Sequence, residues 1–198
     1  MSWFQSWACL LPFAMGVVMP AVVAWRLERK EPRLAIRDGS IAAGALILLL
    51  LILWTFSGAP FSQVVAAALF ATAFAVFAAG AFAMLIGCRV RPAAAQVVVG
   101  CVVALLFSTV FLAGPAIEAA PLDAKVSRAE LVVVVNPFVV VAGDALQLDV
   151  LHDPTLYATH IVDYVRAIPA WWRVAGGYLL AGLLLAGIGL GIHRAVRA

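Results

Sequence analysis

The chain has 198 residues, of which 66% are hydrophobic and 12% are charged, and its formal net charge at pH 7 is +3. This composition excludes an ordinary soluble domain, in which about 45–50% of residues are apolar and about 25% are charged. It also excludes a nucleic-acid-binding protein, which needs a basic exposed face, because the positive charge is confined to short loops. The composition predicts an integral membrane protein with a single transmembrane domain over residues 1–198.

Five apolar runs are long enough to cross a bilayer core, which takes roughly 20 helical residues. We expect each run to be a helix, because backbone amides in lipid must be satisfied within their own segment and no alternating barrel pattern is present. No Lys or Arg precedes the first run, so we expect a retained helix there and not a secretory signal. The runs cover residues 7–25, 40–56, 64–86, 96–113 and 174–192.

Basic residues follow the first, third and fifth runs. With five spans these positions share one side, and the positive-inside rule makes that side cytoplasmic. The amino terminus and the net acidic segment 115–173 are then outside, and the carboxyl terminus is inside. The basic residues are Arg26, Arg29, Lys30, Arg33, Arg37, Arg89, Arg91, Arg194 and Arg197.

Small residues recur at every fourth position of the third run and predict a helix-packing face. A four-residue period keeps them on one slowly drifting face, where small side chains let another helix approach closely. The pattern favours packing within the chain's own bundle, and a dimer interface is the alternative. The row is Ala67, Ala71, Ala75, Ala79, Ala83 and Gly87, and a second small patch comprises Gly187, Gly189 and Gly191.

The chain lacks the motifs of catalysis and of energy supply. It has neither a P-loop nor a G-x-S-x-G nucleophile elbow. The three histidines lie outside the middle of the spans, so a membrane cytochrome is not expected. The interior of each span lacks ionisable residues, so an ion relay is not expected either. We therefore predict a non-catalytic chain without a cofactor, and any transport would be driven by a partner.

One group of residues in the segment 115–173 has the spacing of metal ligands. Asp149 and His152, and likewise His160 and Asp163, are three residues apart, which on a helix places both groups on one face. Pro154 separates the two pairs. Solvated or helix-capping roles for these side chains are the alternative to a metal site.

The stretch "VVVVNPFVVVAG", Val132 to Gly143, is as apolar as a span but too short to cross as a helix. Asn136-Pro137 interrupts it in the middle. A buried core, the membrane interface and a re-entrant hairpin are its possible places.

From about residue 64 onward, the order of these features resembles the permease subunits of ABC-2 type (type V) exporters. In that family a short basic turn joins the fourth and fifth helices, matched here by "GCRVRPAAAQVVVG", Gly87 to Gly100. The family then carries an outer segment with a pattern close to NPF, D-L, P-x-L-Y and P-x-W before the last helix. The matching residues are Asn136-Pro137-Phe138, Asp149 with Leu151, Pro154-Thr155-Leu156-Tyr157 and Pro169-Ala170-Trp171.

The resemblance implies an all-α membrane protein with five transmembrane helices, which correspond to the second through sixth of the family's six, so that the first is missing. A re-entrant or interfacial helical segment containing Asn136, Pro137 and Phe138 would lie between the fourth and fifth helices. Such a subunit sits in the bacterial inner membrane and works with a separate P-loop ATPase and a second permease subunit, the same or paralogous.

The resemblance also implies where the ATPase would bind. The candidates for contact are Glu28, Arg29, Lys30 and Glu31, in the loop after the first run. Pro32 stands where the family pattern has glycine, so this part of the match departs from the family. The alternative function is a structural or scaffolding subunit of a larger respiratory or enzyme complex.

Overall fold

A computed structural model of the chain describes residues 2–150, 161–165 and 167–195. The described residues are mostly helical and contain no strand. Five of their helices are long and apolar enough to cross a membrane, as the sequence predicts, and a bent pair of shorter helices passes the same test when taken together. These helices are α1 (Trp3–Glu28), α2 (Pro32–Thr55), α3 (Phe61–Gly87), α4 (Pro92–Glu118) and α8 (Trp171–Ala195).

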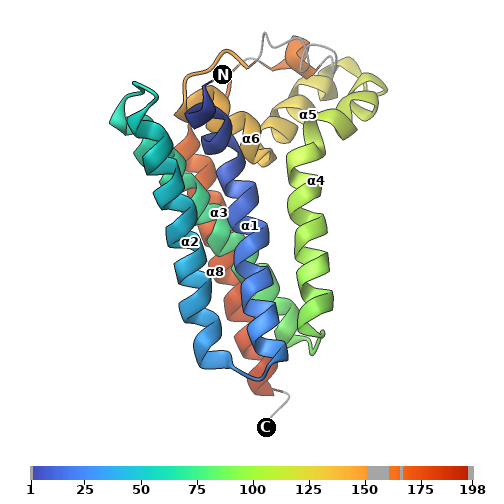
Figure 1. Cartoon of the computed structure of the whole chain (residues 1–198). Coiled ribbons are helices and arrows are strands. Elements are labelled where there is room, and N and C mark those ends of the chain that lie inside the picture. Colours follow the sequence, from blue (N-terminus) through green and yellow to red (C-terminus); the bar gives the residue numbers. More distant parts are fainter. Residues whose placement is uncertain (1, 151–160, 166, 196–198) are drawn as a thin grey trace.

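Four of the long helices form the main bundle, and α4 stands at its edge (Figure 1). The most extensive interface joins α3 to α8, and α1 packs against α2, α3 and α4. The shorter helices α5 (Leu122–Val135) and α6 (Pro137–Val140) lie across the end of the bundle at which α1 begins. The described part of α8 ends at the opposite end of the bundle from the start of α1 (Figure 1).

Large apolar side chains cover the outside of the bundle. In water such a surface would be an aggregation hazard, whereas in a bilayer it faces lipid tails. The helix α2 is the clearest case, because only 11% of its most apolar 18-residue stretch is buried inside the protein. Exposed examples on α2, α4 and α8 are Ile41, Leu48, Ile52, Val97, Leu105, Leu112, Leu180, Leu184 and Leu190.

Glycine lets α3 and α8 touch through their backbones. A Cβ atom built on Gly182 would lie 2.6 Å from the Val76 carbonyl oxygen, and one on Gly189 would lie 2.7 Å from that of Ala83. On α3, a Cβ on Gly80 would overlap the backbone of Gly182. This contact is closer than any side chain permits, as expected where small residues mediate helix packing in membranes.

The predicted row of small residues on α3 is only partly buried. Ala67, Ala71 and Ala75 are buried, Ala83 is half-buried and Ala79 is exposed. The last member, Gly87, would overlap the backbone of Gly189 if it carried a Cβ atom. In the second small patch, Gly189 lies against α3, whereas Cβ atoms on Gly187 and Gly191 would meet nothing within 4 Å.

This difference in burial gives a prediction for two alanines one turn apart. Ala75→Leu should lower the free energy of unfolding by about 1–3 kcal/mol, because added bulk in a packed interior displaces its neighbours. Ala79→Leu should be tolerated, since Ala79 is exposed and borders an open groove. Unfolding in detergent micelles, followed by far-ultraviolet circular dichroism, measures both. Equal stability of the two variants would contradict the burial described here.

Candidate functional site

The helical path is interrupted between α5 and α6, within the apolar stretch from Val132 to Gly143. The helix α5 ends at Val135, and after the break α6 runs into a turn of π-helix, η1 (Val141–Ala145). The axes on the two sides of the break differ by 81°. Pro137 has no N–H to continue the helix, and Asn136 before it is extended, with φ −94° and ψ 106°.

Asn136 holds the break together with its side chain. It is the one buried polar side chain among the described residues, with 1% of its surface exposed. Its Oδ1 accepts a hydrogen bond from the Val139 N–H at 3.1 Å and so caps α6. Its Nδ2 donates to the Phe107 carbonyl at 3.0 Å and to Thr109 Oγ1 at 3.2 Å, both on α4. The amide therefore uses both its acceptor and its donor.

Tyr178 on α8 supports the break from the other side. Its hydroxyl donates to the carbonyl of Val135, the last residue of α5, at 2.7 Å. In a continuous helix that carbonyl would bond the Val139 N–H, which here is taken by Asn136. The Tyr178 ring packs edge-on against Phe74, with centroids 4.9 Å apart. Tyr178 on α8 thus satisfies a backbone carbonyl that the bend leaves open, and α4 holds the Asn136 side chain that satisfies the Val139 N–H. A helix break in an apolar surrounding requires such partners.

The bend is also joined to the start of α8. The Asp144 carboxylate, in η1, accepts a hydrogen bond from the Trp171 N–H at 2.8 Å. A carboxylate suits this position because the first N–H groups of a helix lack partners and carry partial positive charge. On the α3 side, Gln63 Nε2 donates to the Leu146 carbonyl at 3.0 Å. The bent segment is therefore fixed to α3, α4 and α8.

The residues predicted for a re-entrant segment lie at this bend. Asn136 and Pro137 are buried, and Phe138 is half-buried against the main core. Sequence reasoning missed the partners Thr109 and Tyr178. A tyrosine inside an apolar helix needs a partner for its hydroxyl, and that signal could have pointed to Tyr178.

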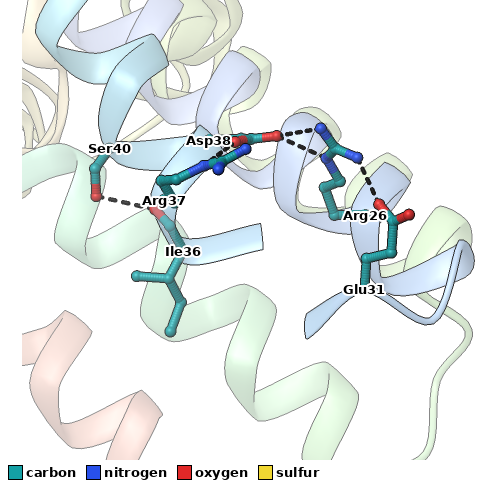
Figure 2. A network of polar contacts seen from close by, with 6 residues as sticks. All are labelled: Arg26, Glu31, Ile36, Arg37, Asp38 and Ser40. Atoms are coloured by element: carbon teal, nitrogen blue, oxygen red, sulfur yellow. Dashed lines mark hydrogen bonds and ion pairs between the residues drawn. The ribbon is translucent and has the colours of Figure 1, made fainter. Parts of the chain in front are cut away.

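Charged residues gather at the opposite end of the bundle, where α1 turns into α2. Figure 2 shows the guanidinium of Arg26 between two carboxylates: its Nε lies 2.6 Å from Asp38 Oδ2, and its Nη1 lies 2.5 Å from Glu31 Oε2. Arg37 Nε donates to the second oxygen of Asp38 at 3.0 Å. The side chains of Arg26 and Asp38 are only 19% and 17% exposed, so this network ties α1 to α2.

The predicted loop from Arg26 to Asp38 is mostly helical. The helix α1 continues to Glu28 and α2 begins at Pro32, which leaves a three-residue turn from Arg29 to Glu31. Proline favours the first position of a helix, because its missing N–H would have no helical partner there. The predicted outer segment is also shorter at its start, since α4 continues through Pro115 to Glu118.

The four predicted ATPase-contact residues fall into two groups. The acids are engaged within the chain: Glu28 Oε1 accepts the Ala93 N–H at 3.2 Å, near the start of α4, and Glu31 pairs with Arg26. The two basic residues, Arg29 and Lys30, are exposed. The Arg29 guanidinium lies 4.3 Å from the centre of the Trp25 ring, and Lys30 has a left-handed backbone with φ 60°.

The predicted metal ligands are only partly within the described residues. Asp149 and Asp163 are described, whereas His152 and His160 lie outside, as does the Pro154–Tyr157 part of the family pattern. Within residues 2–150, 161–165 and 167–195, no group of three or more His, Cys, Asp or Glu side chains could hold a metal ion.

Comparison of the chain with protein-family models, curated proteins and solved structures gives no match. Function is therefore inferred from the residues and contacts of the chain itself. The described residues include most of those that carry the ABC-2 resemblance. They are Gly87–Gly100, from the end of α3 into α4, Asn136-Pro137-Phe138, at the bend, Asp149, and Pro169-Ala170-Trp171, at the start of α8.

Proposed function

We propose that the chain is the non-catalytic, membrane-spanning permease subunit of an ABC-2 type export complex. A separate P-loop ATPase drives it, and a second permease subunit, the same or paralogous, completes the pathway. The observation that carries the proposal is the buried 81° break at Asn136-Pro137 between the fourth and fifth long helices. It coincides with the motif on which the resemblance to these permeases depends.

The distribution of charge supports an orientation in the bacterial inner membrane. The helices α1, α3 and α8 end at the same end of the bundle (Figure 1), and Arg29, Lys30, Arg89, Arg91 and Arg194 lie there. The positive-inside rule assigns that end to the cytoplasm, with the amino terminus outside and the carboxyl terminus inside. The bent pair then enters the outer leaflet and returns as a re-entrant segment.

The proposed mechanism places the energy source in the partner. The chain has no P-loop of its own, so nucleotide hydrolysis belongs to the ATPase. The turn between α1 and α2 presents exposed Arg29 and Lys30 to the cytoplasm. Movement of this turn would pass into α1 and α2 together, because Arg26 pairs with Asp38 across them. The helix α1 also packs against α4, whose residues Phe107 and Thr109 hold Asn136.

One observation favours the second candidate, a scaffolding subunit of a respiratory or enzyme complex. Glu28 and Glu31 already bond within the chain, which leaves two basic side chains on a three-residue turn as the contact surface. Native purification in mild detergent, followed by mass spectrometry, separates the two functions. The transport proposal predicts a P-loop ATPase in stoichiometric amount, whereas redox subunits without an ATPase would favour the scaffold.

Two double variants test whether the ATPase binds the turn. Arg29→Ala with Lys30→Gly should reduce co-purified ATPase at least tenfold while the bundle stays folded, because both side chains are exposed and glycine readily adopts a left-handed φ. The comparison variant, Glu28→Ala with Glu31→Ala, should lower the thermal unfolding midpoint, because it removes a bond to α4 and a partner of Arg26. Undiminished ATPase binding after the Arg29 and Lys30 changes would remove the main support for coupling at this turn.

A further inference from the structure

An apolar groove of about 440 Å³ runs along α8 on the side that faces α4. Its walls include Phe77 on α3, Leu106 on α4 and Val134 near the end of α5. Its floor is the face of α8 on which Arg173, Gly177 and Ala181 recur at four-residue intervals. At 1.5 Å per residue this face extends for about 12 Å. The volume is in the range of small-molecule sites, about 300–1,000 Å³.

The chemistry of the groove suits a hydrocarbon chain. Among the described residues that line it, the only polar side chain apart from Arg173 is Tyr178, whose hydroxyl is bonded to the Val135 carbonyl. Water needs two to four polar partners to occupy a site, and the groove offers too few. The floor is open, because a Cβ atom built on Gly177 would meet nothing within 4 Å.

Arg173 gives one end of the groove a positive charge. Its side chain is exposed, and its guanidinium lies 5.0 Å from the centre of the Trp172 ring. Among the described residues no carboxylate forms an ion pair with it. Trp and Arg at the start of a spanning helix lie at headgroup depth in a bilayer, where Arg attracts anionic lipid headgroups.

We propose that this groove is a binding site for one anionic phospholipid of the surrounding bilayer. One acyl chain lies on Gly177 between α8 and α4, and the headgroup phosphate pairs with Arg173. The lipid comes from the leaflet on the side of the α5–α6 bend. This site is independent of the proposed transport function, because it requires no partner subunit.

Competition between two lipids tests the site directly. Delipidated protein in detergent is mixed with equimolar phosphatidylglycerol and phosphatidylcholine of identical acyl chains, and bound lipid is counted by native mass spectrometry. The wild-type protein should retain one phosphatidylglycerol in preference to phosphatidylcholine. Gly177→Leu should lower this occupancy at least tenfold by filling the groove. Gly176→Leu is the matched control, because its Cβ position is equally open but outside the lining, and should change occupancy less than twofold.

A third variant separates the charge from the groove. Arg173→Gln should keep lipid bound but abolish the preference for phosphatidylglycerol. Circular dichroism and size-exclusion elution check that each variant is folded. If Gly177→Leu does not fold, Leu106→Phe replaces it, because it fills the groove from the opposite wall. The proposal is overturned by equal occupancy in the two glycine variants, or by a phosphatidylglycerol preference that survives Arg173→Gln. It is equally overturned if the protein is a dimer that Gly177→Leu dissociates, since the occupant would then be a second copy.

Discussion

Replacing Gly182 with leucine should destroy the main bundle, with a loss of about 3 kcal/mol or more in the free energy of unfolding. A Cβ atom at this position would lie 2.6 Å from the Val76 carbonyl oxygen and 2.7 Å from the Phe77 backbone nitrogen. Backbone atoms cannot rotate away as a side chain can, so α3 and α8 would have to separate. Unfolding in micelles and the yield of monodisperse protein measure the loss.

Gly187→Leu provides the control on the same helix. A Cβ atom on Gly187 meets nothing within 4 Å, so its replacement should leave the unfolding midpoint nearly unchanged. Both variants add the same side chain to α8, which cancels general effects of leucine on helix propensity. If Gly182→Leu were as stable as Gly187→Leu, α3 and α8 would not touch through their backbones.

Asn136→Leu should be the second severe change, with an expected loss of about 2–4 kcal/mol. The substitution removes the cap of α6, typically about 1 kcal/mol. Because the Val139 N–H is buried, losing this capping bond costs up to the roughly 1–3 kcal/mol of an unsatisfied polar group, and the bonds from Asn136 Nδ2 to Phe107 and Thr109 are lost as well, at about 1 kcal/mol each. Hydrogen exchange over residues 137–145 should accelerate, because the bend loses its tie to α4.

Two further variants resolve the contributions at the bend. Tyr178→Phe removes one hydrogen bond, to the Val135 carbonyl, and should cost about 1 kcal/mol. Asn136→Asp keeps the acceptor that caps α6 but removes the donor to α4, so it should slow exchange relative to Asn136→Leu. Wild-type exchange rates in the leucine variant would show that the side chain does not hold the break.

The position of the bend could be predicted from the sequence, whereas its supports could not. An apolar stretch too short to span, with a proline in the middle, must stop being a regular helix near that proline. The bonds that satisfy it come from Phe107 and Thr109 on α4 and from Tyr178 on α8, far away in the chain. Such pairings depend on how the helices pack, which local sequence does not specify.

Dependence on helix packing also explains why the predicted helix ends and the predicted packing face on α3 differ from the structure. Apolar runs mark the thickness of a hydrocarbon core, but charged residues such as Arg26 and Asp38 extend helices past it by pairing with each other. The four-residue row predicted on α3 includes the buried Ala67, Ala71 and Ala75 but also the exposed Ala79. The contact with α8, however, depends on Gly80 and Gly87, seven residues apart, facing Gly182 and Gly189 with the same separation. A repeat shared by two distant helices is visible only once they are side by side.

The central claim is that the chain crosses the membrane five times, with the α5–α6 bend on the side of the amino terminus. Cysteine accessibility from the two sides of the membrane measures this most directly. With Cys9 and Cys101 replaced by alanine, the native Cys88 reports the turn after α3, where it is exposed. With Cys88 also replaced by serine, Ser2→Cys and Ser127→Cys report the start of α1 and the exposed face of α5. An impermeant thiol reagent should label both introduced cysteines from one side and Cys88 only from the other. Labelling of residue 127 from the side of Cys88 would contradict the account.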